Sequence, residues 1–198
     1  MTYLSLILCM IGAFLLGSVP FGLVIAKTFK DIDPRKAGSG NIGSTNVARL
    51  CGWPCGLLTL FCDIMKGTLP VLIAVHVLPE QFQQSLVALA AVMGHIKSPF
   101  LGGKGGKGVA TTIGALIPLA FLPLLCAVGC FFAVVFATRY VSLSSMTMSV
   151  ALVVFYAVFG HWQLLPLGVV LAVMIIWAHR SNIGRLMRGE ESRFVLKK

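Results

Sequence analysis

Residues 108–140 read GVATTIGALIPLAFLPLLCAVGCFFAVVFATRY, and this run decides how many times the chain crosses a membrane. It has no charged residue before Arg139 and is too long for a single crossing, which takes about 20 residues. Pro118 and Pro123 interrupt it, and proline breaks or kinks a helix. We therefore predict a short helix over 108–119 and a longer one over 122–139. One helix kinked at the prolines is the alternative.

The composition places the whole chain in a membrane. Of its 198 residues, 58% are hydrophobic and 11% are charged, and the mean hydropathy is +0.94. A soluble domain has about a quarter of its residues charged. The first residues lack a basic start and an A-x-A cleavage site, so they are expected to form a retained span. The predicted spans lie near 3–26, 53–77, 82–96, 108–119, 122–139, 143–159 and 163–179.

The basic residues favour seven spans over six. With seven, every Lys and Arg except Lys66 falls on one side, while the loops VLPEQFQQ, IPLAFLP and FGHWQ carry none. With six, Arg139 and the C-terminal tail would lie opposite the first two basic loops. The positive-inside rule therefore predicts an all-α protein with seven transmembrane helices, an outside N-terminus and a cytoplasmic C-terminus. The fourth helix is short, and residues 1–198 form one domain. Topology explains the net charge of +10 better than nucleic-acid binding does.

The stretch AGSGNIGSTNVAR, residues 37–49, is polar and rich in glycine. Glycine lets the backbone approach a ligand closely. Thr45 or Asn46 is expected to cap a helix beginning near Val47, whose N-terminus would favour an anion. A solvated turn is the equally weighted alternative. The candidate binding residues are Ser39, Gly40, Asn41, Thr45, Asn46 and Arg49.

A second stretch, GHIKSPFLGGKGGKGVATT, covers residues 94–112. Its glycines alternate with Lys104 and Lys107, which suits a nest of backbone amides around a phosphate. It is not a Walker A loop, because Leu101 stands where that motif has glycine and Gly108 where it has Ser or Thr. A basic turn flanking the membrane is the alternative. The candidates here are His95, Lys104, Gly105, Gly106 and Lys107.

Two later stretches add polar residues. RYVSLSS contains Ser142, and helix capping explains it equally well. In HRSNIGRLMRGEES, the residues His179, Asn182 and Arg185 share one helical face, although the arginines could instead hold lipid headgroups. Within the second span, Asp63 and Lys66 are three residues apart and are expected to pair for structural reasons.

Several common chemistries are absent from the sequence. There is no G-x-S-x-G elbow, no H-x-x-x-x-D dyad and no cluster with metal-ligand spacing. The six cysteines lie in or beside apolar runs without C-x-x-C spacing, so small buried thiols are expected. The polar segments are rich in cations and glycine and poor in carboxylates. They indicate a site that holds phosphate without a strong base.

GSGNIGSTNVAR, the GH…KGGKGVAT block, RYVSLSS and H..NI.RL..G.E together resemble the bacterial acyl-phosphate:glycerol-3-phosphate acyltransferases, called PlsY. The resemblance runs from about Gly17 to Glu191. The family usually reads G-H-x-aromatic-P, whereas here Lys97 and Ser98 precede a proline shifted by one.

The resemblance implies a seven-helix enzyme of the bacterial plasma membrane whose active site faces the cytoplasm. It would transfer a fatty acyl group from acyl phosphate to the 1-hydroxyl of glycerol 3-phosphate without metal or cofactor. Its partners would be these two substrates and the lipid bilayer, and the chain would be a monomer. The resemblance assigns site residues to all four stretches: Ser39, Asn41, Thr45, Asn46, Arg49, His95, Lys104, Gly105, Gly106, Lys107, Ser142, His179, Asn182 and Glu191.

The physical chemistry of the reaction agrees with that assignment. Two anionic substrates need cations to offset their repulsion, and stabilising phosphate charge is the main catalytic lever. We expect Arg49, Lys104 or Lys107, Ser39 and Asn182 to hold glycerol phosphate, and the glycine amides and Ser142 to receive acyl phosphate. The substrate's own phosphate is the first candidate to take the proton, ahead of His95 or His179. A phosphate or organophosphate transporter and a lipid-binding structural protein are the alternatives.

Overall fold

The computed structural model describes residues 2–194, and every regular element in that range is a helix. Lys197 and Lys198, counted above among the basic residues, lie outside the described residues. The chain divides into two compact units, which meet between Leu119 and Ala120 in the sequence. The expectation of a single domain stays a prediction.

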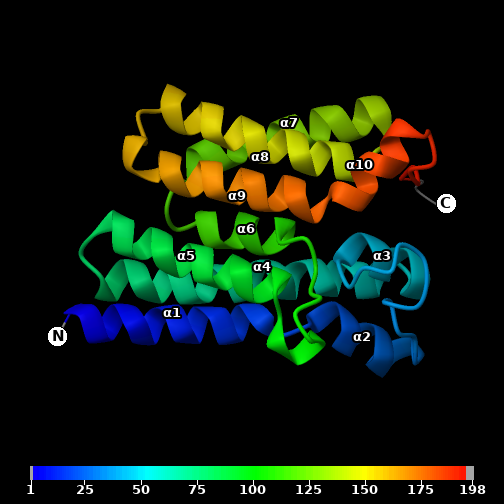
Figure 1. Ribbon diagram of the computed structural model, residues 1–198, viewed down its shortest axis with the longest axis horizontal. Helices are drawn as coiled ribbons and strands as arrows, with labels where there is room; N and C mark the ends of the chain where they lie inside the picture. Colours follow the sequence, from blue (N-terminus) through cyan, green and yellow to red (C-terminus); the bar gives the residue numbers. More distant parts are fainter. Residues whose placement is uncertain (1, 195–198) are drawn as a thin grey trace. The chain divides into compact units, whose positions relative to one another are not determined.

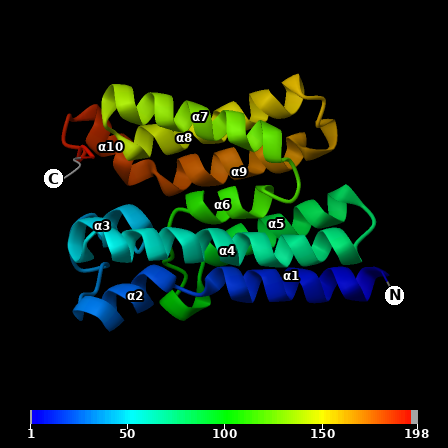
Figure 2. The same cartoon turned by 180° about the vertical axis from the view of Figure 1, so that it is seen from behind.

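The first unit is built of six α-helices, drawn from blue to green in Figure 1. They are α1 (Thr2–Ser18), α2 (Phe21–Lys30), α3 (Ser44–Cys51), α4 (Trp53–Val77), α5 (Gln81–Ile96) and α6 (Val109–Leu116), with the 3-10 turn η1 (Pro99–Leu101) after α5. The second unit is drawn from yellow-green to red (Figures 1 and 2). It contains α7 (Phe121–Thr138), α8 (Val141–Val158), the 3-10 turn η2 (Trp162–Leu164), α9 (Leu165–Ala178) and α10 (Arg180–Met187).

Four segments of the described chain are long and apolar enough to cross a membrane. They are Tyr3–Lys30, which takes in α1 and α2, and the helices α4, α7 and α8. A fifth is added if α9 and α10 form one span bent by 58°. Many of their exposed side chains are large and apolar, such as Ile7, Phe61 and Phe136, which suits contact with lipid. The all-helical membrane architecture is confirmed, while the number seven and the orientation stay predictions.

The opening run of residues 108–140 forms two helices, as expected. The first, α6, has only 8 residues and ends at Leu116, and α7 begins at Phe121. The prediction of a short helix followed by a longer one is therefore confirmed, and the single kinked helix is wrong.

Two predicted helix boundaries were wrong. The first span breaks at Val19 and Pro20, because proline has no N–H to continue the ladder. The helix expected from Val47 begins at Ser44, and neither Thr45 nor Asn46 caps it, since its cap residue is Gly43. His179, expected to share a helical face with Asn182 and Arg185, directly precedes α10, which carries the other two.

Small residues let the helices of the first unit pack closely. At Gly114 of α6, a Cβ atom would lie 1.9 Å from the carbonyl oxygen of Ile64 on α4, and Gly67 of α4 lies as tightly against α6. Gly17 and Gly94 bring α1 and α5 together in the same way. Such contacts are typical of membrane helices, whose association depends on close backbone approach. They bring α1 close to α5 and α4 close to α6.

Gly114→Ala should lower the unfolding temperature of the purified protein in detergent. The added methyl group would clash with backbone, and overpacking of this kind costs about 1–3 kcal/mol. Gly12→Ala on α1 is the matched control, since a Cβ there meets nothing within 4 Å. The control should keep or raise the unfolding temperature because alanine favours helix. Equal unfolding temperatures for the two variants would contradict the packing described here.

Candidate active site

The side-chain amide of Asn46 organises the loop between α2 and α3. Its Nδ2 group donates to the carbonyl oxygens of Pro34, Ala37 and Asn41 at 3.0, 3.2 and 2.9 Å. Its Oδ1 atom accepts the backbone N–H of Ser39 at 2.9 Å. Asn46 is 2% exposed, so this amide lies beneath the loop and its bonds are made within it. The geometry therefore gives Asn46 a positioning role.

Other predicted residues of this loop lie nearer its surface. Gly38 has a positive φ, and a Cβ there would lie 2.2 Å from Asn46 Oδ1, so only glycine fits. Asn41 Oδ1 accepts the N–H of Gly43 at 2.8 Å, which shapes the approach to α3. Ser39 and Gly40 are exposed and Thr45 is half-buried. Arg49 is exposed in the last turn of α3.

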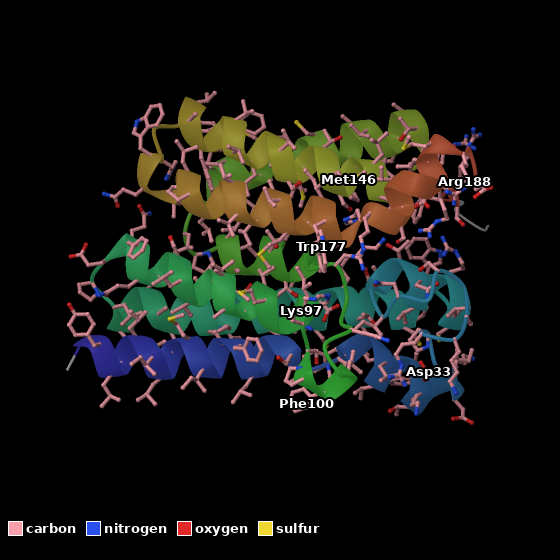
Figure 3. The ribbon with its side chains drawn as sticks, viewed as in Figure 1. Asp33, Lys97, Phe100, Met146, Trp177 and Arg188 are labelled. Carbon is pink, nitrogen blue, oxygen red and sulfur yellow. The ribbon has the colours of Figure 1, made fainter. Side chains whose placement is uncertain are left out.

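An exposed ion pair lies just beyond α2, where Figure 3 labels Asp33. Arg35 Nη2 lies 2.7 Å from Asp33 Oδ2. The hydrogen bonds from Arg35 hold the pKa of Asp33 well below its usual range. Arg35 is therefore paired with a carboxylate, whereas Arg49 is expected to bind a phosphate.

The glycine-rich loop folds back onto the end of α5, where Lys97 and Phe100 are labelled in Figure 3. The N–H groups of Gly105 and Gly106 donate to the carbonyl oxygens of Ile96 and His95, each at 3.1 Å. The amides of residues 102–104 likewise donate to carbonyls of residues 98–101. Position 106 requires glycine because the loop packs against the His95 ring, where a Cβ would lie 2.1 Å from Nε2.

This geometry corrects the expected cradle of glycine amides. The amides of residues 102–106 are bonded to the chain itself, so Gly105 and Gly106 shape the loop instead of presenting N–H groups to a phosphate. The cationic side chains remain as the groups suited to an anion: Lys104 is exposed and Lys107 is half-buried. His95 is only 4% exposed, which places its ring in the packing beneath the loop.

In the second unit, Glu191 joins two of the predicted segments, the one with Ser142 and the one with Asn182 and Arg185. Its Oε1 atom accepts from Ser142 Oγ at 2.7 Å and from Asn182 Nδ2 at 2.5 Å, and its Oε2 atom accepts from Arg185 Nε at 2.7 Å. Its side chain is 8% exposed. Burial opposes ionisation, but these three donors outweigh it and lower the pKa of Glu191 below its ordinary value. The carboxylate is therefore a charged anchor for the cluster.

The anchored carboxylate orients Asn182. Because Nδ2 donates to Glu191, the Oδ1 atom must point elsewhere, and within the described chain it is buried without a hydrogen-bond partner. A buried acceptor of this kind calls for a donor from outside the described residues. His179, 2% exposed, donates from Nδ1 to the carbonyl oxygen of Ile175 at 2.8 Å. Its Nε2 atom is then the acceptor of the neutral ring.

The C-terminal tail beyond Glu191 is bonded to the turn between α7 and α8. The N–H of Phe194 donates to the carbonyl oxygen of Arg139 at 2.7 Å, and Arg193 Nε lies 3.4 Å from the hydroxyl oxygen of Tyr140. The tail thus runs along the turn between α7 and α8, beyond the end of α10 where Arg188 is labelled (Figure 3).

Sequence reasoning missed two contacts. Asp63 Oδ1 lies 3.8 Å from His95 Nδ1, although the sequence indicated no carboxylate near a histidine. Arg185 was noted for its helical face, but its ion pair with Glu191 was not expected. The first contact joins different helices, so no spacing rule within one segment could reveal it. The second contact does have a signal in the sequence, because Arg185 and Glu191 lie on either side of Gly189 and glycine favours a turn. In the structure Gly189 has a positive φ.

The fold, the cations of the first unit and the polar groups around Glu191 define a helical membrane protein suited to anionic substrates. The chain belongs to the glycerol-3-phosphate acyltransferase family, whose model matches residues 7–189. It is 51% identical to a glycerol-3-phosphate acyltransferase of Nitratidesulfovibrio vulgaris over 90% of this chain and 55% of that protein. It is 47% identical to the Desulfovibrio desulfuricans protein of the same name, over 94% of this chain and 83% of that one.

Two solved structures share the fold. Both are crystal structures of PlsY (YgiH), an integral membrane glycerol 3-phosphate acyltransferase, one in its glycerol 3-phosphate form and one in its lysophosphatidic acid form. Each is 40% identical to this chain and covers 96% of it and 96% of its own chain. The TM-scores are 0.92 and 0.90.

The lowered pKa of Glu191 predicts a pH-dependent contribution to stability. A carboxyl group with a depressed pKa stabilises the folded state fully above its unfolded pKa of about 4.3, and that stability is lost as the pH falls through the lower folded value. Glu191→Gln should therefore lower the unfolding temperature at pH 7, with a smaller deficit below about pH 4. In the Glu191→Gln variant, the side-chain amide N–H would face the guanidinium group of Arg185 in place of the carboxylate oxygen Oε2.

Glu190→Gln is the matched control, because the side chains of Glu190 and Arg188 are 58% and 61% exposed and such pairs contribute little. Thermal unfolding of all three proteins from pH 3.5 to 8 measures the effect. A deficit for Glu191→Gln that is independent of pH, or equal to that of the control, would contradict the assignment.

Proposed function

We propose that this protein transfers a fatty acyl group from acyl phosphate to the 1-hydroxyl of glycerol 3-phosphate, giving lysophosphatidate and phosphate. The match to the family over residues 7–189 carries the proposal. It is supported by the likeness to structures named for their glycerol 3-phosphate and lysophosphatidic acid forms. This reaction is the first step of bacterial phospholipid synthesis, and the two ligands of those structures are its acceptor and its product.

The proposed setting is the bacterial plasma membrane, with seven helices, an outside N-terminus and a cytoplasmic C-terminus. The distribution of Lys and Arg supports this orientation. Helices α5, α6 and α9, with 16, 8 and 14 residues, would complete the seven as short or tilted spans. We further propose that residues 1–198 act as one domain and as a monomer, with the site facing the cytoplasm.

The cations would offset the repulsion between two phosphorylated substrates. Arg49 can clamp a phosphate with two parallel N–H groups, and Lys104 and Lys107 provide point charges from the glycine-rich loop. Ser39, held in place through its backbone by Asn46, offers a hydroxyl. Holding the two substrates in a reactive geometry supplies much of the remaining rate acceleration.

The transfer itself needs little from a base, because acyl phosphate is already activated. The 1-hydroxyl oxygen forms a bond to the acyl carbon, the bond from that carbon to the phosphate oxygen breaks, and inorganic phosphate leaves. We propose that the phosphate of glycerol 3-phosphate takes the hydroxyl proton. The surroundings of His95 support this route over that histidine as the base, because its ring is enclosed beside Asp63 and Gly106.

Within the second unit, the polar groups around Glu191 are suited to hydrogen bonds with a substrate. Asn182 Oδ1 is an acceptor suited to a substrate hydroxyl, and Glu191 holds it in that orientation. Ser142 is tied to the same carboxylate. Asn182→Asp would put a second negative charge beside Glu191, so we propose that asparagine is required here for its neutrality.

Purified protein given acyl phosphate and labelled glycerol 3-phosphate, without acyl-CoA, should form labelled lysophosphatidate. Acyl-CoA in place of acyl phosphate is the control and should give no product. Absence of product with acyl phosphate across several detergents and lipids would contradict the proposal and would favour transport of a phosphorylated solute.

Arg49→Ala and Lys107→Ala should each lower kcat/KM by at least about 100-fold, the effect expected when a charge-stabilising group is removed from a reacting phosphate. Arg35→Ala and Lys36→Ala are the matched controls, because both side chains are exposed in the same unit and Arg35 is paired with Asp33. The controls should stay within about threefold of the wild type, since exposed pairs contribute little. Near-normal turnover of either site variant would refute its assignment.

A further inference from the structure

A buried ion pair lies in the middle of α4, apart from the residues assigned to the reaction. Lys66 Nζ and Asp63 Oδ1 are 2.8 Å apart, and their side chains are 1% and 3% exposed. Charges within a membrane span are costly, and a buried pair often adds no stability over apolar residues. Its presence therefore calls for a role other than stability.

Lys66 reaches the point where the first span breaks. Its Nζ atom donates to the carbonyl oxygen of Val19 at 2.8 Å and lies 5.7 Å from the centre of the Phe21 ring. Pro20 interrupts the helical ladder there, so Leu23 donates to the carbonyl of Pro20 instead of to that of Val19. The ammonium group is thus engaged by a carboxylate, a carbonyl and an aromatic ring, which suits positioning and not catalysis.

The same break is bonded to the glycine-rich loop. Ser98 Oγ donates to the carbonyl oxygen of Ser18 at 2.6 Å, and the carbonyl oxygen of Ser98 accepts the N–H of Gly103 at 2.9 Å. Ser98 is 1% exposed. The neighbouring carbonyls of Ser18 and Val19 at this break therefore bind Ser98 and Lys66, respectively. Figures 1 and 2 show α5, the loop and the break together.

Asp63 approaches the loop by a second route. It lies 3.8 Å from His95 Nδ1, a buried atom that has no hydrogen-bond partner within the described chain. On the other side of the ring, Nε2 lies against Gly106, whose N–H donates to the carbonyl oxygen of His95. The imidazole is thus held between the buried carboxylate and the loop.

We propose that Asp63 and Lys66 are positioning residues for the glycine-rich loop. Lys66 fixes the break between α1 and α2 to which Ser98 is bonded, and Asp63 fixes the orientation of the His95 ring, whose other side packs on Gly106. Together they set where Lys104 and Lys107 stand. The catalytic consequence of this role rests on the proposed function, in which those lysines bind phosphate.

The double variant Asp63→Leu with Lys66→Met tests the proposal without leaving an unpaired buried charge. Hydrogen exchange of the wild type and the variant, followed by mass spectrometry of peptides covering residues 97–108, reads the loop directly. The amides of Gly105 and Gly106 should exchange at least about tenfold faster in the variant, since exchange reports local opening. Thr68→Val, which removes a hydrogen bond from α4 to Gly114 of α6, is the matched control and should leave this exchange unchanged.

Kinetics separate positioning from a purely structural role. The KM for glycerol 3-phosphate should rise about tenfold in the double variant while kcat changes by less than about threefold, because a displaced loop weakens binding first. Ser98→Ala removes the hydrogen bond from the loop to the carbonyl of Ser18 and leaves both charges in place. It should also speed exchange in the same peptides. This variant keeps the proposal testable if the double variant does not fold. Wild-type exchange and KM in the double variant, or wild-type exchange in Ser98→Ala, would overturn it. Lack of acyltransfer by the wild type would refute the proposed function alone, because exchange is read without substrate.

Discussion

The ammonium group of Lys66 makes the interactions on which the first unit depends. It neutralises Asp63 inside a membrane span and caps the carbonyl of Val19, where Pro20 ends α1. The carbonyl of Val19 also accepts the N–H of Phe21, and the bond from Lys66 occupies its second acceptor position. These bonds lie where the first span turns into α2, which leads to the loop that carries Ser39 and then to α3, which carries Arg49.

Glu191 has the corresponding role in the second unit. One carboxylate binds the start of α8, the middle of α10 and the guanidinium of Arg185, and the tail beyond it is bonded to the turn before α8. Its charge is maintained by these donors, and it determines which way the amide of Asn182 points. In both units a buried charge holds irregular backbone and orients neighbouring polar groups.

The glycine-rich loop shows that one residue pattern is compatible with two different structures. Its glycines suggested a nest of N–H groups for phosphate, but the amides of residues 102–106 bond to the end of α5. The glycines are required because His95 and its carbonyl leave no room for a Cβ. Close packing and anion binding both favour glycine, and the residue letters do not separate the two. Likewise, Asn46 was expected to contact substrate and was found beneath its loop, bonded to four backbone groups.

The sequence by itself determined the helical membrane class, the two helices within residues 108–140, the pairing of Asp63 with Lys66 and the segments that form the clusters. These depend on hydrophobic runs, proline and helical spacing, which act over a few residues. Tertiary structure alone decided the contact of Asp63 with His95, the reach of Lys66 to Val19 and the convergence of Ser142, Asn182 and Arg185 on Glu191. Those contacts join segments that no local pattern connects, and they form only when helix packing brings the partners within bonding distance.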